Sequence, residues 1–165
     1  MRNKKVKIMM YITMLSAMAI SLNLLEYMFI PPLPLGVRFG LANIIALISM
    51  KILGVKEMIA VNIMRVFLAN LLRGLLFGMS FWISVSGIIC SSIILIVCNK
   101  LNASIIFTAI LSSLAHVIGQ YLIVVTIYEQ SAVWLWAPVS LAGSFIVGII
   151  TGFIAEMSLK RISKM

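Results

Sequence analysis

Long apolar stretches alternate with short polar breaks along the whole chain. Breaks at charged residues, prolines and glycines give six stretches, at 7–30, 39–54, 57–73, 80–98, 104–128 and 132–158. Because about 20 helical residues cross a hydrocarbon core, each stretch is predicted as a transmembrane helix. The second and third are short, so an alternative with five spans treats residues 39–73 as a re-entrant pair. The pattern predicts an all-α integral membrane bundle of about six transmembrane helices, forming one domain over residues 1–165.

Composition supports this prediction. Of the 165 residues, 63% are hydrophobic and 10% are charged, whereas a soluble domain carries about 25% charged residues. A net charge of +9 would suggest nucleic-acid binding in a soluble protein. Here most basic residues lie at the ends of apolar stretches, which favours membrane topology as the explanation. We therefore expect the lipid bilayer, and no nucleic acid, as a partner.

The basic residues also predict an orientation. With six spans, ten of them fall on one side of the membrane: Arg2, Lys4, Lys5, Lys7, Lys51, Lys56, Lys100, Lys160, Arg161 and Lys164. The positive-inside rule makes that side cytoplasmic. Both termini are then predicted in the cytoplasm of a multi-pass cell-membrane protein. The N-terminal stretch is interpreted as an uncleaved anchor, because its apolar run is longer than that of a signal peptide.

Three basic residues remain, and all are arginines predicted within the membrane or on its outer side: Arg38, Arg65 and Arg73. A charge at mid-depth costs about 2.5–3.5 kcal/mol on insertion scales, so Arg65 is expected to face the protein interior. Guanidinium groups match carboxylates and phosphates, which predicts an anion-binding wall. Alternatively, Glu26 pairs with Arg65 or Arg38 in a structural salt bridge, and Arg73 extends outward to water.

The sequence VNIMRVFLANLLRG, residues 61–74, carries a polar stripe on an apolar helix. Its members fall within an arc of about 140° on a helical projection. They are Asn62, Arg65, Asn70 and Arg73. We interpret all four as candidate ligand-binding residues.

A second polar face lies in SSLAHVIGQYL, residues 112–122, where Ser112, His116 and Gln120 are spaced four apart. His116 and Gln120 offer donors and acceptors that suit a heterocycle or an amide. The alternative is hydrogen bonding between helices, worth about 0.6 kcal/mol per contact. A metal site is not predicted, because one histidine, two distant cysteines and no aspartate supply too few ligands.

Two further features have two interpretations each. Trp134 and Trp136 form either an aromatic belt at the lipid headgroups or a stacking wall for a flat ligand. Ala17 and Ser21 lie four apart on one helix face, where small side chains permit close approach. They serve either packing within the bundle or docking onto another membrane protein.

Four segments carry a family resemblance: PPLPLGVRFGLANIIAL, MRVFLANLLRGLLFG, SVSGIICSSII and LAHVIGQYLIV. They resemble the Gx transporter family, also described as heptaprenyl diphosphate synthase component I, over about residues 8 to 160. The most specific pieces are Gly40-Leu41-Ala42-Asn43, the Arg65 segment, and Ala115-His116 with Gly119-Gln120.

The family in turn resembles the substrate-binding S components of energy-coupling-factor (ECF) vitamin transporters. This resemblance implies a six-helix protein that binds a vitamin from outside and works with a T component and two cytoplasmic ATPases. Arg38 and Arg65 would hold an anionic group, and Asn43, His116 and Gln120 would hydrogen-bond the ligand. A flavin, or another phosphorylated or aromatic vitamin, is the favoured ligand. Ala17-x-x-x-Ser21 is an imperfect match to the Ala-x-x-x-Ala docking motif of S components.

Alternatives remain at this point. Prenyl diphosphate synthases hold magnesium diphosphate on aspartate-rich motifs, and this chain has no aspartate. We therefore expect no enzyme, and a non-catalytic membrane partner of a prenyl diphosphate synthase is the second class of function. A third class is a proton-coupled carrier, which would be expected to show inverted repeats. Any use of ATP must come from partners, because the chain has no Walker motif.

Overall fold

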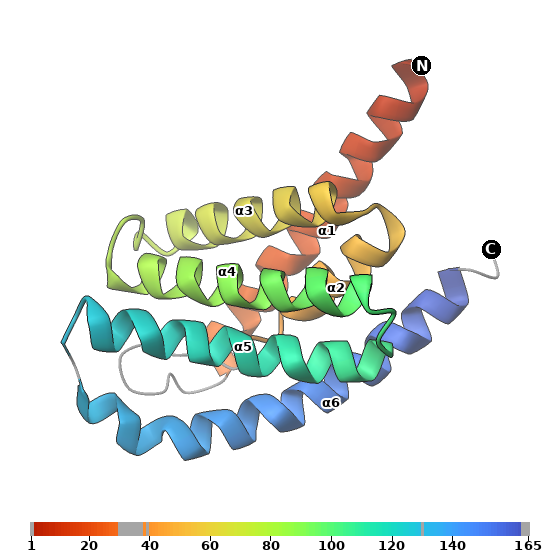
Figure 1. Cartoon of the computed structure of the whole chain (residues 1–165). Helices are drawn as coiled ribbons and strands as arrows, with labels where there is room; N and C mark the ends of the chain where they lie inside the picture. Colours follow the sequence, from red (N-terminus) through yellow and green to blue (C-terminus); the bar gives the residue numbers. More distant parts are fainter. Residues whose placement is uncertain (1, 30–37, 39, 130, 163–165) are drawn as a thin grey trace.

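The computed structural model describes residues 2–29, 38, 40–129 and 131–162. All regular structure in these residues is helical, which confirms the all-α prediction (Figure 1). The elements are α1 (Arg2–Phe29), α2 (Asn43–Ile52), α3 (Val55–Leu72), α4 (Met79–Lys100), α5 (Ile105–Thr126), the 3-10 segment η2 (Ser131–Trp136) and α6 (Ala137–Ile162). The proline-containing segment at 30–37 lies outside the described residues.

Four of these helices are long and apolar enough to cross a membrane: α1, α4, α5, and α6 together with η2. The other two differ from the predicted spans in ways that their residues explain. Helix α2 has ten residues and is therefore only about 15 Å long, where a span over 39–54 was predicted. Helix α3 has 18 residues but contains Lys56, Glu57 and Arg65. A count of six transmembrane spans therefore stays a prediction.

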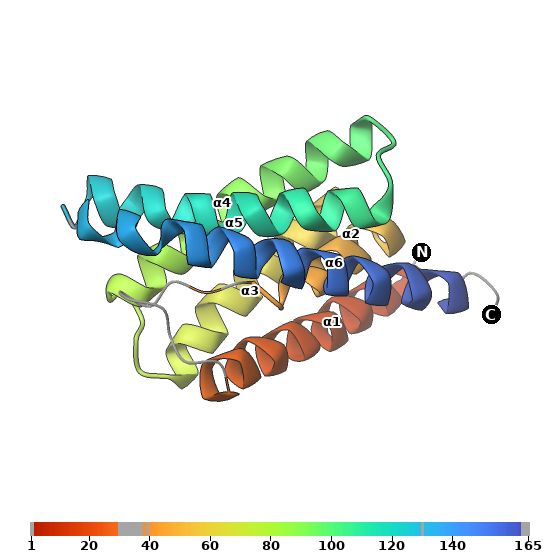
Figure 2. The same cartoon turned by 90° about the horizontal axis from the view of Figure 1, so that it is seen from below.

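Helix α2 lies at the centre of the bundle, and the other helices surround it (Figures 1 and 2). Eight of its ten residues are buried, and Leu47 packs in one core with Met58, Leu95 and Ala155. A second core joins α5, η2 and α6 around Tyr121. The most extensive helix contacts are those of α5 with α4 and with α6, whereas α1 packs mainly along α3.

Most basic residues lie in segments that come together at one end of the bundle. The start of α1, the end of α6, the turn between α2 and α3 and the turn between α4 and α5 lie at this end (Figure 1). There the Lys51 ammonium donates to Asn99 Oδ1 at 2.8 Å, joining the end of α2 to the end of α4. The structure thus brings together the loops that the charge pattern assigned to one side of the membrane. Which side is cytoplasmic stays a prediction.

Candidate functional site

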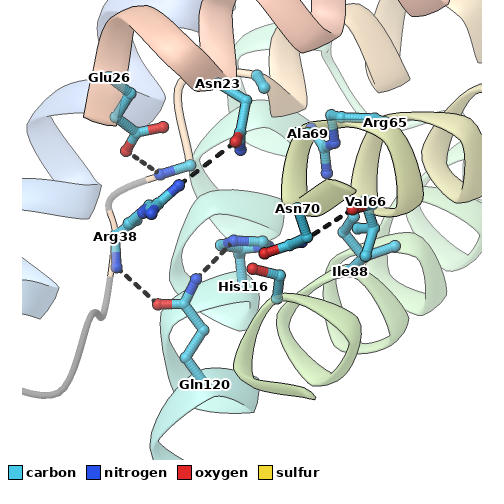
Figure 3. Close-up of a pocket in the computed structure, with 13 residues that line it drawn as sticks. Asn23, Glu26, Arg38, Arg65, Val66, Ala69, Asn70, Ile88, His116 and Gln120 are labelled. Atoms are coloured by element: carbon cyan, nitrogen blue, oxygen red, sulfur yellow. Dashed lines mark hydrogen bonds between the residues drawn. The ribbon is translucent and has the colours of Figure 1, made fainter. Parts of the chain in front are cut away.

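A polar cavity lies in the half of the bundle away from the basic end. Its volume is about 20 Å³, which is enough for one water molecule. Helices α1, α3, α4 and α5 and the segment before α2 contribute its lining (Figure 3). The polar lining residues are Asn23, Glu26, Arg38, Arg65, Asn70, Ser84, His116 and Gln120.

Arg65 is the most deeply buried cation of this cavity, with 2% of its surface exposed. Among the described residues its guanidinium makes one hydrogen bond, from Nη2 to Asn43 Oδ1 at 3.3 Å. The Nε–H is buried without a partner there. A guanidinium has five N–H donors, and a buried unsatisfied donor costs about 1–3 kcal/mol. Arg65 therefore has donor capacity that no hydrogen bond among the described residues uses.

Glu26 is buried beside the arginines but does not neutralise them by direct contact. Its Oε1 accepts from the Gly40 amide at 2.9 Å. It lies within electrostatic range of Arg38 and Arg65, yet no ion pair within 4.0 Å joins these three described residues. The structural salt bridge considered for Glu26 is therefore not formed. Two guanidinium groups around one carboxylate leave the cavity with a net positive charge.

Arg38, in the segment before α2, links α1 to α5. Its amide donates to Gln120 Oε1 at 2.8 Å, and its guanidinium donates to Asn23 Oδ1 at 3.3 Å (Figure 3). Burial lowers the pKa of Arg38 from its ordinary value, and the charge of Glu26 opposes this shift. The side chain is thus a second buried cation that faces the same cavity.

His116 and Gln120 form the neutral wall of the cavity on α5. Gln120 Nε2 lies 2.8 Å from His116 Nε2. Because an amide nitrogen only donates, this ring nitrogen accepts, and the hydrogen of a neutral ring is placed on Nδ1. Nδ1 is buried beside the backbone of Gly87 and makes no hydrogen bond of ordinary geometry among the described residues. The prediction that these two residues share one face of the helix is confirmed by this contact, and their role in ligand binding stays a prediction.

Two glycines hold the His116 ring from two sides. A Cβ at Gly40 would lie 3.1 Å from the ring's Cδ2, and a Cβ at Gly87 would lie 2.8 Å from its Cε1. Gly40 also has φ +85, a conformation that other residues rarely adopt. Both positions therefore require glycine for the ring to occupy this place.

Asn70 lines the cavity, whereas Arg73 lies beyond it. Arg73 donates to Ala69 O at 3.1 Å and also to Asn70 Oδ1. Its guanidinium carbon lies 5.1 Å from the centre of the Tyr27 ring, and that of Arg38 lies 5.0 Å from the same centre. Arg73 and Tyr27 therefore belong to the surroundings of the cavity rather than to its lining.

Several predicted site residues lie away from the cavity lining. Asn62 points to α4, where its Nδ2 donates to Ser92 Oγ at 3.0 Å. Trp134 and Trp136 are exposed, and Trp134 stacks on Tyr121 with ring centres 5.8 Å apart. Ala17 and Ser21 are exposed on α1. A role in ligand binding for these tryptophans, or in docking for these small residues, stays a prediction.

Asn23, Ser84 and Gly87 were not predicted as site residues. Asn23 lies three residues before Glu26 on α1, and such a polar pair on an apolar helix is a signal that periodicity analysis could have used. Ser84 and Gly87 carry no comparable signal, because serine and glycine are common in membrane helices. Their role depends on how closely α4 and α5 approach.

The long apolar helices and the buried polar cavity define an all-helical membrane protein with a positively charged internal site. The chain belongs to the family described as heptaprenyl diphosphate synthase component I, whose family model matches residues 15–158. This match confirms the resemblance drawn from the sequence. Searches of curated proteins and of solved structures found no match.

Proposed function

We propose that the protein is the membrane-embedded substrate-binding subunit of an ECF-type transporter and that it binds a small anionic molecule. The supporting observation is Arg65, a fully buried guanidinium with one hydrogen bond among the described residues. Retaining such a charge within a membrane protein is costly unless another group compensates it, and no ion pair among the described residues does so for Arg65. Arg38 and Arg65 hold the anion, and His116 and Gln120 contact the neutral part of the ligand.

The cavity volume constrains how this ligand binds. Ligand pockets usually measure about 300–1,000 Å³, far above the 20 Å³ of this cavity. Binding therefore requires the cavity to widen, and a flavin requires more widening than a compact anion does. The ligand class that fits the proposal best is a molecule whose carboxylate or phosphate contacts the arginines.

The proposed partners are a T component and two cytoplasmic ATPases. The ATPases supply ATP hydrolysis, for which this chain has no Walker motif. The proposed docking surface is the exposed side of α1 that carries Ala17 and Ser21. In this proposal both termini are cytoplasmic and the cavity faces the outer half of the membrane.

The ligand test is native mass spectrometry of the protein purified in mild detergent. Wild type is expected to retain an anionic small molecule. Arg65→Gln should lose it because the charge is removed, while keeping the wild-type circular dichroism spectrum. The control is Arg161→Gln, because Arg161 is exposed near the end of α6 and far from the cavity. Retention of the ligand by Arg65→Gln would contradict the proposed site.

The orientation test is cysteine labelling at positions 35 and 130, in a background with Cys90 and Cys98 replaced by alanine. A membrane-impermeant maleimide added to intact cells should label both positions. Position 103, in the turn between α4 and α5, is the control and should react only after lysis. Labelling of position 103 in intact cells would reverse the orientation and with it the side of the cavity.

A second candidate function is that of a non-catalytic membrane partner of a prenyl diphosphate synthase. The family description favours it, because that description names a synthase component. Affinity purification separates the two candidates. Co-purification of ATPases with an integral membrane partner supports transport, whereas co-purification of an aspartate-rich prenyl synthase supports the alternative.

A further inference from the structure

A second cavity lies beside the polar one and has the opposite character. It is an apolar groove of about 290 Å³ between α3 and α4, lined by Asn62, Ile63, Val66, Phe67, Phe81, Val85, Ile88 and Ile89. Ile63, Phe67 and Ile89 are exposed in the bundle, so the groove opens toward the lipid. The apolar lining ends at Asn62, which is tied to Ser92.

The groove and the polar cavity share two lining residues, Val66 and Ile88. These two side chains are therefore the partition between a positively charged cavity and an apolar groove. The polar cavity alone is far smaller than a ligand pocket, whereas the groove is close to the lower end of the usual range. Movement of the two partition side chains would join the two spaces into one site with a cationic end and an apolar end.

From this juxtaposition we infer that the ligand is an amphiphile, with its anionic head on Arg65 and Arg38 and its hydrocarbon chain in the groove between α3 and α4. This inference rests on the proposed anion site and deepens it by naming the class of substrate. The amphiphile enters sideways from the bilayer, past Phe67 and Ile89. A diphosphate or a carboxylate on an unbranched or prenyl chain satisfies the same chemistry.

The hydrocarbon chain gains little energy simply by leaving lipid for the groove, because both are apolar. The groove contributes by shape and by keeping the head near the arginines. A test must therefore distinguish specific occupation of the groove from partitioning of any amphiphile into the bilayer. Variants that fill the groove make this distinction, because they leave the bilayer unchanged.

Ile89 and Ile93 provide a matched pair for such variants. Both lie on α4, one turn apart, and each is 54% exposed, but only Ile89 lines the groove. Ile89→Trp should fill the groove, and Ile93→Trp should add the same bulk beside it. Both side chains already face outward, so tryptophan is expected to be tolerated at either position.

The experiment measures binding of farnesyl diphosphate, inorganic diphosphate, farnesol and laurate to the protein in lipid nanodiscs by calorimetry. Ile89→Trp should lower the affinity for farnesyl diphosphate by at least about tenfold and leave the affinity for inorganic diphosphate unchanged. Ile93→Trp should change neither ligand. Laurate tests whether the head of the natural ligand is a carboxylate. In that case laurate should bind more tightly than farnesyl diphosphate, and Ile89→Trp should lower its affinity.

Three results would overturn the inference. The first is that wild type, Ile89→Trp and Ile93→Trp bind the tighter of farnesyl diphosphate and laurate with equal affinity. The second is that Ile89→Trp weakens the binding of both diphosphates equally, and the third is that farnesol binds more tightly than farnesyl diphosphate. The proposed function fails separately, if Arg65→Gln leaves the affinity for inorganic diphosphate unchanged. As an independent readout, a photoreactive farnesyl diphosphate should label peptides containing residues 63–67 or 85–89, and excess farnesyl diphosphate should suppress the labelling.

Discussion

Helix α4 contacts α5 on one side and α3 on the other, and the two contacts are built differently. Toward α5 the backbones touch: a Cβ at Gly119 would lie 2.7 Å from Ser86 O, and Ser86 Oγ donates to Gly119 O at 2.6 Å. Toward α3 an apolar groove of about 290 Å³ intervenes, beside the hydrogen bond of Asn62 with Ser92. One helix thus has a close-packed side and an open side.

The two sides of α4 are suited to different roles: the close contact with α5 to holding residues in place, and the open contact with α3 to movement. The close contact of α4 with α5 places His116 and Gln120 within a wall that cannot move without breaking backbone packing, because close-packed interiors do not deform continuously. The open contact with α3 leaves Arg65 on a helix that can shift. A cavity of about 20 Å³ must widen to admit a ligand, and widening is cheapest where packing is already open. We therefore expect opening between α3 and α4.

The largest effect on stability is expected from the close contact. Gly119→Ala places a Cβ against the Ser86 carbonyl, and relieving this overlap requires a backbone shift that costs about 1–3 kcal/mol. Thermal unfolding in detergent measures the loss. Gly78→Ala is the control, because its Cβ would lie 3.4 Å from the nearest atom. Equal unfolding temperatures for the two variants would show that the α4–α5 contact is not rigid.

The next effect concerns the link from α5 to the segment before α2. Gln120→Leu leaves the buried Arg38 amide without its acceptor, which is expected to cost about 2 kcal/mol. Gln120→Glu keeps an acceptor at this position and should cost less. The comparison uses the same unfolding measurement. A larger loss in the glutamate variant would show that burying a carboxyl group beside His116 costs more than losing the acceptor.

A smaller effect on stability but a clear effect on binding is expected at Gly87. Gly87→Ala meets the His116 ring rather than backbone, so the ring moves and stability falls by only about 1 kcal/mol. The displaced ring no longer presents its edge to the cavity, and ligand affinity should fall about tenfold. Calorimetry with the retained ligand measures this. Unchanged affinity would show that His116 does not contact the ligand.

The smallest effect is expected across the open contact. A double-mutant cycle of Asn62→Ala and Ser92→Ala should give a coupling energy of about 0.6 kcal/mol, typical of hydrogen bonds between membrane helices. Ser91→Ala is the control, because its hydroxyl bonds to Ile88 O in its own helix. A coupling above about 2 kcal/mol would mean that α3 and α4 are held together, contrary to the expected opening.

Much of the fold was predictable because membrane helices need long apolar runs. Helices α4 and α5 begin and end within two residues of the predicted bounds. Helix α2 was predicted as a span because hydropathy cannot distinguish apolar residues that face lipid from apolar residues that face protein. Its eight buried residues show that its apolar character serves the core.

The candidate site was partly predictable for a related reason. Arg65, Asn70, His116 and Gln120 were expected inside because polar groups avoid lipid, and all four line the cavity. Asn62 belongs to the same helical stripe, but a stripe about 140° wide faces two neighbours, and Asn62 faces α4 instead. Glu26 was weighed as the partner of Arg65, yet its carboxylate accepts from the Gly40 backbone.

The chain's hydropathy and charge pattern alone indicate a helical membrane protein with cationic groups turned inward, because the cost of charge in lipid acts on each helix separately. The packing of the helices is needed to show which inward groups share a cavity, and that Val66 and Ile88 divide this cavity from an apolar groove. Those features depend on how closely helices approach and at what rotation. Small residues such as Gly87 and Gly119 set that approach, and their effect appears only when a second helix is present.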